Sequence, residues 1–445
     1  MARRPLPHQR RVLRWSQERD SIGLLLRMRL GKSFCLIRWA QRRAADGRKL
    51  VVAPLSVLPG WVEELAAEGL PSVLLVGSSK RKLELLDSAP SNSWCLLNPE
   101  GLRSCRPLAY QPWTVVALDE STFIKNPTAK ITKLCCTAFK DVKDKAILTG
   151  EPRPESDLEV VPQMLFLNGS FMGCDTFWKW RHRHAYQAGF EWRLRRESKE
   201  RFDRELAKHC FAMTPDEAGI FMPCVRQRRV IELPAAVRGL YNRAIRDWAI
   251  GEAETKWTPV VHSWLQQIAS GLIPRQFQSD QLFFSPHKFD ELVRLLTGEL
   301  KNEKFVVFFR FNREVALAAD RLRRAGVKLH CFTGLSRLRW RHECVRRLRA
   351  GRCRGLLLQE RCARYGLNLS EADVAIFFDN YPDWETRSQA AARILHPMKK
   401  RTSLVLDLVA RGTVDEALLQ ALNEKRRSAR ALMQRIQQLM KEVAR

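Results

Sequence analysis

The sequence predicts an α/β fold with two parallel-sheet lobes and a helical region between them. Between residues 22 and 150, apolar runs of strand length alternate with amphipathic segments of helix length, and the same alternation returns after residue 300. Strands that are apolar throughout are typical of a parallel sheet that helices cover on both faces. From residue 155 to residue 286 the alternation stops and helical patterning replaces it.

The predicted strands define the lobes. Those of the first lobe are Ile22–Leu26, Leu50–Ala53, Val73–Val76, Trp94–Leu97, Thr114–Leu118 and Ala146–Leu148. Those of the second are Phe305–Phe309, Lys328–Phe332, Gly355–Leu358, Val374–Phe378 and Ser403–Leu408. We therefore expect a first lobe over 1–154, a helical insertion over 155–286, a second lobe over 287–412 and a C-terminal helical extension over 413–445.

The charge balance predicts a polyanionic partner. The 445 residues include 77 Lys and Arg against 48 Asp and Glu, a net charge of +29 that is spread over the whole length. Nucleic acid is favoured over a membrane surface, because no amphipathic anchor or lipidation motif is present. No apolar run reaches the roughly 18 residues that span a bilayer, and no signal core follows the N-terminus, so we expect a cytoplasmic protein. The twelve cysteines lack zinc-ligand spacing.

The stretch LLLRMRLGKS contains a candidate phosphate-binding loop. Gly31, Lys32 and Ser33 lie between the predicted strand Ile22–Leu26 and a predicted helix, Phe34–Arg43, although Leu26 occupies the position of the motif's first glycine. An ordinary basic turn is the alternative. In a phosphate loop, backbone amides at the helix N-terminus hold the phosphates, Lys32 reaches the β and γ oxygens, and Ser33 ligates Mg²⁺. The residues expected to line the nucleotide here are Met28, Arg29, Leu30, Gly31, Lys32 and Ser33.

A pair of acidic residues ends a later predicted strand. In TVVALDEST the apolar run leads to Asp119, a candidate Mg²⁺ ligand, and Glu120, a candidate base that orients the attacking water. The alternative role for such a pair is to cap a helix. A strand followed by this pair, 87 residues after Lys32, favours an ATP hydrolase.

Ten segments in order along nearly the whole chain resemble motifs of the SWI2/SNF2-like ATPases of helicase superfamily 2, in particular the compact versions often carried by phages. The segments are PLPHQ, VVAPLSVLPGWVEEL, LLNPEGLR, DESTFIKN, AILTGEP, KFVVFFRF, CFTGLSRLRWR, YGLNLSEAD, QAAARILHP and GTVDEALLQALNEK. The resemblance implies two RecA-like lobes that bind ATP and Mg²⁺ and move along duplex or forked DNA as a monomeric motor.

The resemblance also implies roles for particular residues. Gln9 would read the adenine, and Gly366, Gln389 and the catalytic Arg393 would act on ATP from the second lobe beside Lys32, Asp119 and Glu120 of the first. The residues expected to contact DNA are Ser56, Asn98, Thr333, Gly334 and Asn368.

Three positions depart from the family pattern: Arg29 replaces a glycine, Glu151 a threonine, and His396 the second arginine of the last ATP motif. A histidine is short and cannot present the bidentate fork of an arginine, although Lys399, Lys400 or Arg401 is close enough in sequence to substitute. Two functions stay open: a DNA-dependent ATPase that translocates, and a DNA-binding protein whose degenerate motor core binds ATP weakly or only structurally.

The segment FWKWRHRHAYQAGFEWRLRRESKERF, within the expected insertion, is rich in Trp and Arg. Arginines on phosphates and aromatic rings on bases predict a nucleic-acid surface that includes Arg193, Arg195 and Arg196. A small helical subdomain with buried tryptophans and solvated arginines explains the same pattern, and the two interpretations are compatible.

Overall fold

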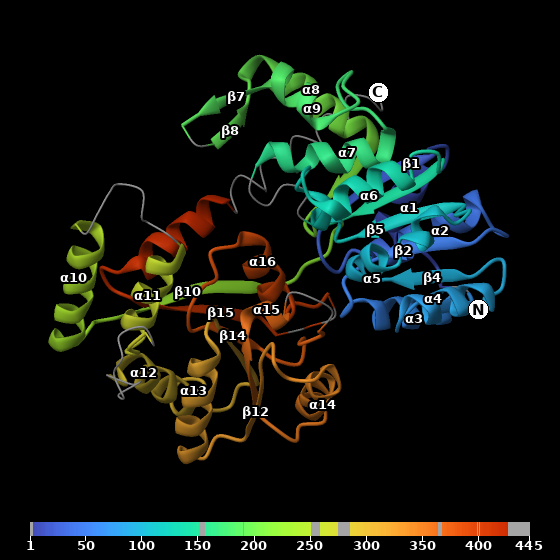
Figure 1. Ribbon diagram of the computed structural model, residues 1–445. Coiled ribbons are helices and arrows are strands. Elements are labelled where there is room, and N and C mark those ends of the chain that lie inside the picture. The colour runs from blue at the N-terminus through green and yellow to red at the C-terminus, as the bar shows by residue number, and fades with distance from the viewer. Residues whose placement is uncertain are drawn as a thin grey trace. The chain divides into compact units, whose positions relative to one another are not determined.

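The computed structural model describes residues 3–150, 156–189, 191–250, 259–274, 285–363, 367–397, 399 and 401–425. These residues form two compact units, of which the first extends to Phe221 and the second begins at Met222. Each unit contains its own parallel sheet (Figure 1). No helix among the described residues combines the length and the apolar character needed to cross a membrane.

The first unit contains a seven-stranded sheet with the order β3-β4-β2-β5-β6-β1-β9. All neighbouring strands pair in parallel. The strands are β1 (Ser21–Leu26), β2 (Lys49–Val52), β3 (Ser72–Leu74), β4 (Trp94–Leu97), β5 (Val115–Asp119), β6 (Asp144–Leu148) and β9 (Cys210–Met213). Every strand predicted from the sequence for this lobe is present, with ends within two residues of the prediction.

Helices cover both faces of the first sheet. They are α1 (Pro7–Ser16), α2 (Lys32–Arg43), α3 (Leu58–Ala67), α4 (Ser79–Asp87), α5 (Pro99–Ser104), α6 (Lys130–Ala138), α7 (Val160–Asn168), α8 (Phe177–His184) and α9 (Arg196–His209), with the 3₁₀ turns η1 (Arg106–Tyr110), η2 (Ser121–Ile124) and η3 (Asp157–Glu159). Along β5, Val116 packs in one core and Ala117 in the other, as alternation in a strand requires. Helices α2 and α3 pack on the Ala117 face, and α5 and α6 pack on the Val116 face.

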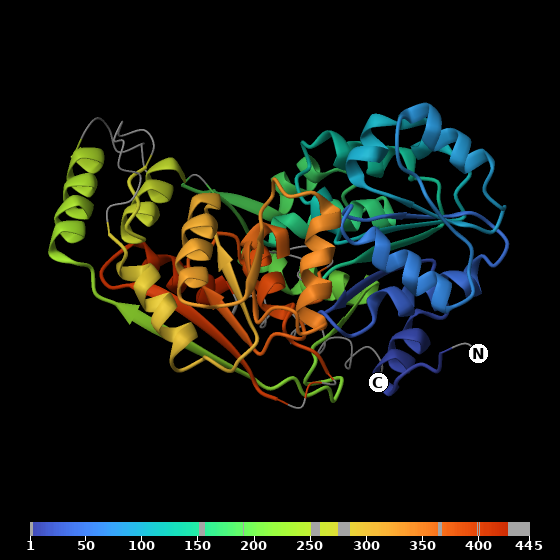
Figure 2. The same ribbon diagram turned by 90° about the horizontal axis from the view of Figure 1, so that it is seen from below.

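The second unit contains a six-stranded parallel sheet with the order β10-β15-β14-β11-β13-β12. Its strands are β10 (Cys224–Ile231), β11 (Phe305–Phe309), β12 (Leu329–Phe332), β13 (Gly355–Gln359), β14 (Val374–Phe377) and β15 (Ser403–Ala410). Its helices are α10 (Ala235–Ile250), α11 (Pro259–Ala269), α12 (His287–Thr297), α13 (Asn312–Arg324), α14 (Leu338–Arg349), α15 (Glu360–Ala363) and α16 (Trp384–Ala392), followed by a helix over 414–425. The strand β10 lies along β15 at one edge (Figure 2).

The region expected to be a helical insertion is divided between the two units. Its first part, up to Phe221, belongs to the first unit, and the rest belongs to the second. The expectation of helices alone is wrong, because this region contains β9, β10 and the hairpin of β7 (Ala185–Ala188) and β8 (Glu191–Leu194). Of these strands, β10 escaped prediction because it is an edge strand with Arg226 and Arg228 exposed. Edge strands need no continuous apolar run.

A buried ionic cluster joins several elements of the second unit. The Lys288 ammonium of α12, fully buried, lies 3.2 Å from Asp379 Oδ1 and 2.9 Å from Asp415 Oδ2. Ser270 donates a 2.8 Å hydrogen bond to Asp379. Burial, and then the nearby Asp379, raises the pKa of Glu314, so this carboxyl keeps its proton beside the cluster. The Lys288 cation therefore balances two carboxylates that are almost completely buried.

We predict that Lys288→Ala lowers the free energy of unfolding of the chain by about 3–5 kcal/mol, because two buried carboxylates lose their cation. Urea unfolding measures this change. The control is Lys301→Ala, an exposed lysine whose loss should change stability by less than about 0.5 kcal/mol. Equal effects of the two substitutions would show that the cluster does not stabilise the second unit.

Candidate functional site

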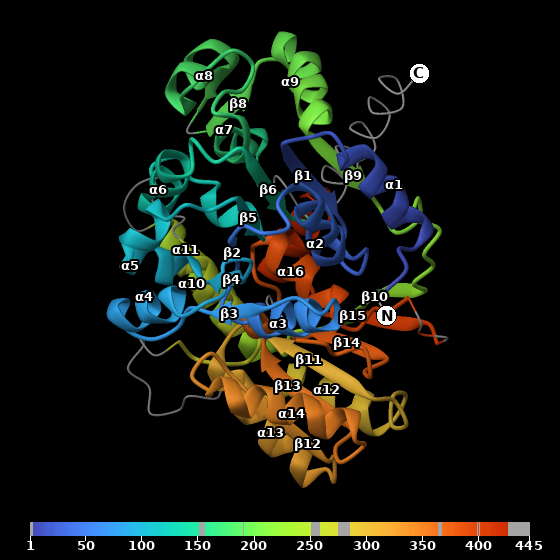
Figure 3. The same cartoon turned by 90° about the vertical axis from the view of Figure 1, so that its right-hand side faces the viewer.

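The predicted phosphate loop connects β1 to α2, as expected (Figure 3). Two of its residues, Arg29 and Gly31, have positive φ angles of 70° and 75°. Successive amides in such a turn form a concave group of N–H donors. Gly31 precedes the first residue of α2 and has no side chain to cap it, so the first amides of the helix are available to an anion. Lys32 is the first residue of α2 and Ser33 the second.

The side chain of Lys32 turns back toward the strand that precedes the loop. Its ammonium donates a 3.0 Å hydrogen bond to the carbonyl of Leu26, and an added Cβ on Gly150 would lie 3.9 Å from it. The cation therefore lies between the ends of β1 and β6. Leu30 is fully buried and anchors the loop to the core on the α2 face of the sheet.

Helix α1 lies against the phosphate loop. Gln9 packs so closely on Gly31 that an added Cβ there would lie 2.3 Å from Gln9 Nε2. His8 Nε2 donates a 3.2 Å hydrogen bond to the carbonyl of Leu30. Burial lowers the pKa of His8, although the Leu30 carbonyl opposes this shift. The structure thus brings Gln9, the predicted adenine reader, beside the loop.

The acidic pair lies at the end of β5. Asp119 is the last residue of the strand and is 5% exposed, whereas Glu120 follows it with a φ of 49°. The two oxygens of Asp119 accept different hydrogen bonds, one of 2.9 Å from the Glu120 amide and one of 2.8 Å from Trp61 Nε1. The conformation of Glu120 is rare for a residue with a side chain, and such conformations are concentrated at functional sites.

Strand register places the loop and the acidic pair at one edge of the first sheet. Leu148 of β6 pairs with Leu24 of β1 on one side and with Asp119 of β5 on the other. Because these strands are parallel, their carboxyl ends meet at the same edge. One strand, β6, separates the loop from the acidic pair.

The same edge carries the predicted DNA contacts of the first unit. Ser56 lies in the turn between β2 and α3, and Asn98 precedes α5 directly after β4. The strand order β4-β2-β5-β6-β1 therefore divides the edge. The predicted DNA-contact residues follow β4 and β2, and the predicted nucleotide residues follow β5 and β1, with β6 between them.

Trp61 is a site residue that the sequence did not reveal. It lies in α3, five residues after Ser56, is 1% exposed and holds Asp119 through its indole N–H. Its ring stacks on Trp94 with the ring centres 6.4 Å apart. This role could not be predicted, because Trp61 and Asp119 are 58 positions apart in the sequence. In addition, a tryptophan in an amphipathic helix normally indicates only packing. Trp61 thus connects the DNA-contact half of the edge to the acidic pair.

These residues suit a magnesium nucleotide. The amides before and at the start of α2, with the Lys32 ammonium, provide donors for phosphate oxygens. The Ser33 hydroxyl and the Asp119 carboxylate provide the oxygen ligands that Mg²⁺ prefers. No group of three or more His, Cys, Asp or Glu side chains with metal-site geometry occurs in the described ranges.

The predicted ATP residues of the second unit lie on and after α16. Gln389 is 5% exposed and donates a 3.1 Å hydrogen bond to Glu385. Arg393 follows the helix, and its Nε donates a 2.9 Å hydrogen bond to the carbonyl of Ala363, while its own carbonyl accepts a 3.2 Å bond from the Leu369 amide. Arg393 is therefore tied to both ends of the segment that contains the predicted Gly366. Gly366 itself, Glu151 and Lys400 lie outside the described residues.

Two of the three cations considered as substitutes for His396, Lys399 and Arg401, contact acidic partners. Lys399 lies 3.0 Å from Asp373 Oδ1, and Arg401 pairs with Asp373 at 2.8 Å and with Glu303 at 2.8 Å. His396 lines a hollow of about 590 Å³ with Lys399, Arg401 and Asp373. The action of Arg393 on ATP stays a prediction.

The predicted DNA contacts of the second unit follow its strands. Thr333 and Gly334 come directly after β12, where the Thr333 amide donates to Ser336 and the Gly334 amide donates to Gln359, at 3.0 and 3.2 Å. Asn368 accepts a 3.2 Å hydrogen bond from the Ser370 amide. Since β12 and β13 are parallel, Thr333 and Gln359 lie at the same edge of the second sheet.

The Trp/Arg-rich segment forms α8, the β7–β8 hairpin and the start of α9, beside α7 in the first unit (Figures 1 and 3). Trp180 is fully buried, whereas Trp178 is 49% exposed, and Arg181 lies over the rings of Trp178 and Trp192 at 4.6 and 4.2 Å. The burial of Trp180 agrees with the subdomain interpretation for that residue, and the nucleic-acid surface stays a prediction.

The arginines predicted to contact DNA here differ in their surroundings. Arg193 pairs with Glu191 at 3.2 Å, and Arg195 donates a 3.2 Å hydrogen bond to the Ala185 carbonyl. Arg196, the first residue of α9, is exposed. Their contact with DNA stays a prediction.

A phosphate-type loop and an acidic pair at one edge of a parallel sheet, followed by a second parallel-sheet unit, define a helicase-like protein with two RecA-like lobes. The chain belongs to the SNF2-related domain family, whose model matches residues 8–272, and the model of the helicase conserved C-terminal domain matches residues 287–397. The membership predicted from the sequence motifs is confirmed; the association with phages stays a prediction.

Similar proteins occur in distant organisms. The chain is 24% identical to "Chromodomain-helicase-DNA-binding protein 1-like" of Mus musculus, covering 86% of this chain and 44% of that protein. It is 22% identical to "Putative ATP-dependent helicase/translocase YwqA" of Bacillus subtilis, covering 89% and 45%. The chain thus spans less than half the length of each of these two relatives.

A solved structure supports the fold. The Hef helicase domain of Pyrococcus furiosus aligns with 94% of this chain and 98% of its own, with a TM-score of 0.53 and 13% identity. At this identity the likeness bears on the fold alone, and it agrees with the two RecA-like lobes predicted from the sequence.

We predict that Trp61→Phe weakens binding of Mg²⁺–ADP by about tenfold or more, because a hydrogen bond to a charged group contributes about 1.5–3 kcal/mol. Binding of ADP in EDTA should not change. Titration calorimetry measures both.

The matched control is Trp94→Phe. It removes the same atoms from the ring stacked on Trp61, but Trp94 Nε1 has no hydrogen-bond partner in the described part of the chain. Equal losses of Mg²⁺–ADP affinity in the two variants would mean that Trp61 contributes packing and not the position of Asp119.

Proposed function

We propose that this chain is an ATP-dependent DNA translocase, a motor that couples ATP hydrolysis to movement along duplex or forked DNA. The observation that carries the proposal is the divided edge of the first sheet. The phosphate loop follows β1 and the acidic pair follows β5, on either side of β6. The segments that resemble DNA contacts follow β2 and β4, the next two strands beyond β5. The similarity to the Bacillus subtilis protein, a putative ATP-dependent helicase/translocase, supports this proposal.

The residues of the first unit divide the work of hydrolysis. The loop amides and Lys32 would bind the phosphates, and the Lys32 ammonium lies beside the ends of β1 and β6, next to the loop. Asp119 and Ser33 would hold Mg²⁺, which would supply positive charge beside the phosphates. Glu120, raised out of the strand by its positive φ, orients the attacking water and accepts its proton. Trp61 keeps Asp119 in place.

The second unit supplies the remaining groups in this proposal. Arg393 stabilises the charge on the transferred phosphoryl group, and Gln389 helps to position the nucleotide, as the resemblance implies. The tie of Arg393 to Ala363 and Leu369 would let a shift in that segment move the arginine. Such a link between segments is the kind of element that couples hydrolysis to movement.

DNA is the proposed track because the motor would contact phosphates and not bases. The net charge of +29 suits a partner whose backbone carries one negative charge per phosphate. Contacts to phosphates set the position of a protein on DNA without reading its sequence. A motor that moves along DNA must bind it regardless of the base sequence.

We predict DNA-stimulated ATP hydrolysis by the purified chain, which Lys32→Ala and Glu120→Gln should nearly abolish. Glu120→Gln should still bind ATP, because the amide keeps the size of the side chain but cannot accept the proton. A coupled phosphate-release assay with and without duplex DNA, alongside ATP binding, measures these effects. If the wild-type chain binds DNA but neither hydrolyses ATP nor responds to Lys32→Ala, the binding-protein function with a degenerate core replaces the motor.

We predict that Arg393→Ala lowers the rate of hydrolysis by about 10³-fold or more, the lower range for an arginine that stabilises the transition state. His396→Arg should raise the rate, because it restores a second guanidinium. The control is Arg401→Ala, whose guanidinium pairs with Asp373 and Glu303 and should matter little to the rate. If Arg393→Ala hydrolyses ATP at the wild-type rate, the second unit takes no part in the proposed hydrolysis.

A further inference from the structure

The second sheet ends in a long edge strand. β10 is the outermost strand of this sheet and pairs with β15 over all of its eight residues. The other edge strands of the two large sheets, β3, β9 and β12, have three, four and four residues. Proteins normally keep exposed edge strands short, because the unpaired backbone groups of a long edge can pair with another chain. The edge formed by β10 is therefore a candidate interaction surface.

The outer backbone groups of β10 have no partner in the described part of the chain. On the β15 side, the carbonyl of Ile231 accepts a 2.9 Å hydrogen bond from the amide of Arg411. Backbone groups alternate between the two sides of a strand, so those of Arg226 and Arg228 point away from β15. No described residue forms a backbone hydrogen bond with these two arginines on that outer side. The outer edge can therefore accept a further strand.

Two arginine side chains at this edge lack a counter-charge. Arg226 and Arg228 are exposed and form no ion pair with another described residue. Arg229, by contrast, lies 2.6 Å from Glu299 and 3.4 Å from Glu291. Because Arg226 and Arg228 are two residues apart in a strand, their side chains share one face of the sheet. Acidic side chains on that face of an added strand would lie opposite both arginines and be stabilised there.

The same two charges disfavour a second copy of this chain at the edge. In an antiparallel pair of β10 strands centred on Gln227, Arg226 of one copy would lie opposite Arg228 of the other copy. In a parallel pair in register, each arginine would lie opposite itself. Like charges in these positions destabilise a strand pair. The edge therefore favours an acidic strand over another β10.

The other face of β10 borders a hollow with an apolar lining. It measures about 330 Å³, and Leu295, Leu300, Leu404 and Leu406 line it together with Glu299 and the middle of β10. Leu295 belongs to α12, and Leu404 and Leu406 belong to β15, so the hollow lies on the α12 face of the sheet. Side chains of an added strand that point to this face would approach the leucines, so apolar side chains fit there.

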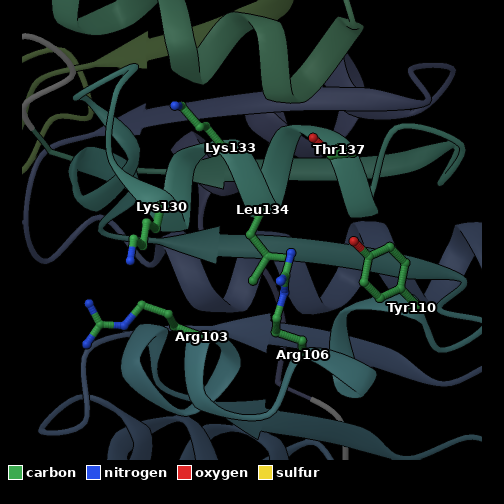
Figure 4. A pocket seen from close by; sticks show the side chains of 7 residues that line it. All are labelled: Arg103, Arg106, Tyr110, Lys130, Lys133, Leu134 and Thr137. Carbon is green, nitrogen blue, oxygen red and sulfur yellow. The ribbon is translucent and has the colours of Figure 1, made fainter.

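This hollow suits a peptide better than DNA. Glu299 lines it and Glu291 lies close by, and both carboxylates would repel a phosphate backbone. The hollow of the first unit in Figure 4 is different, because Arg103, Arg106 and two lysines line it, with no acidic side chain among the described lining residues. In addition, phosphates accept hydrogen bonds from amides but have no donor for the outer carbonyls of β10. A peptide backbone provides both donors and acceptors.

We propose that the outer edge of β10 is a docking site for an extended segment of another protein, which joins the second sheet as a further strand. The segment carries acidic side chains on the face of Arg226 and Arg228 and apolar side chains on the face of the hollow. Backbone hydrogen bonds to the edge would provide affinity, and the alternating side chains would provide specificity. The inference does not depend on ATP hydrolysis or on movement along DNA.

The test measures binding of a short fluorescent peptide in which glutamate and valine alternate, long enough to pair with all of β10. The control peptide has the same composition, with its glutamates and valines in separate blocks, so it has equal charge without two distinct faces. Fluorescence anisotropy should show that the alternating peptide binds about tenfold more tightly or better. Its binding should also slow amide hydrogen exchange at Arg226 and Arg228.

Charge reversal tests the two arginines. Arg226→Glu/Arg228→Glu should weaken binding of the alternating peptide by about tenfold or more, and it should favour a peptide with lysine in place of glutamate. The matched control, Arg349→Glu/Arg352→Glu, makes the same change of charge at two other exposed arginines of the second unit. This control should keep the wild-type preference.

Two variants of Arg228 separate backbone pairing from charge. Arg228→Gln and Arg228→Pro both remove the charge, but only proline also removes the amide hydrogen that points away from β15. Proline is tolerated where the amide side of an edge strand faces solvent. Arg228→Pro should therefore bind the alternating peptide more weakly than Arg228→Gln. The charge reversal keeps the backbone of β10 and tests the proposal even if the proline variant does not fold.

Equal binding of the two peptides, or an unchanged preference after the charge reversal, would overturn the inference. Three further results would replace the proposed partner. If the reversal weakens binding of a DNA duplex and leaves peptide binding unchanged, the edge contacts DNA. If sedimentation shows a wild-type dimer that the reversal dissociates, a second copy occupies the edge. If exchange at Arg226 and Arg228 is already slow without any peptide, a segment of this chain covers it.

Discussion

The parallel pairing of β5, β6 and β1 is the constraint on which the rest of the site depends. Leu148 is paired with both Leu24 and Asp119, so the register of one central strand sets the level of the phosphate loop and of the acidic pair together. A shift of one residue would move each side chain of β6 to the opposite face of the sheet. The apolar residues that fill two separate cores therefore also fix the distance between Lys32 and Asp119.

In the proposed motor, the edge of the first sheet would link DNA contact to hydrolysis. The turn that contains Ser56 leads directly into α3, and Trp61 of that helix holds Asp119. A displacement of α3 by a bound strand would reach the proposed magnesium ligand through a single hydrogen bond. In the second unit, Arg393 is tied to the segment around Ala363 in the same way. Each unit thus connects a predicted ATP residue to an adjacent segment through a short, direct contact.

The sequence predicted those parts of the structure that depend on local pattern. Every strand proposed from an apolar run is present, because a strand buried on both faces needs such a run, and the Gly-Lys-Ser turn lies where a strand must lead into a helix. The family motifs located the site residues, although the roles of those residues stay predictions. Contacts between distant positions were not predictable: Trp61 with Asp119, and Lys288 with Asp379 and Asp415, are combinations that no local spacing reveals. The strands β7, β8 and β10 were missed because their exposed, polar positions interrupt any apolar run.

The most direct test of the account is a triplex-displacement assay, in which a third strand bound to a DNA duplex is released when a motor moves through it. The account predicts release by the wild-type chain with ATP and Mg²⁺, no release with a non-hydrolysable ATP analogue, and none by Glu120→Gln with ATP. Failure of the wild-type chain to release the third strand, under conditions in which it binds the duplex and hydrolyses ATP, would contradict the claim that hydrolysis drives movement along DNA.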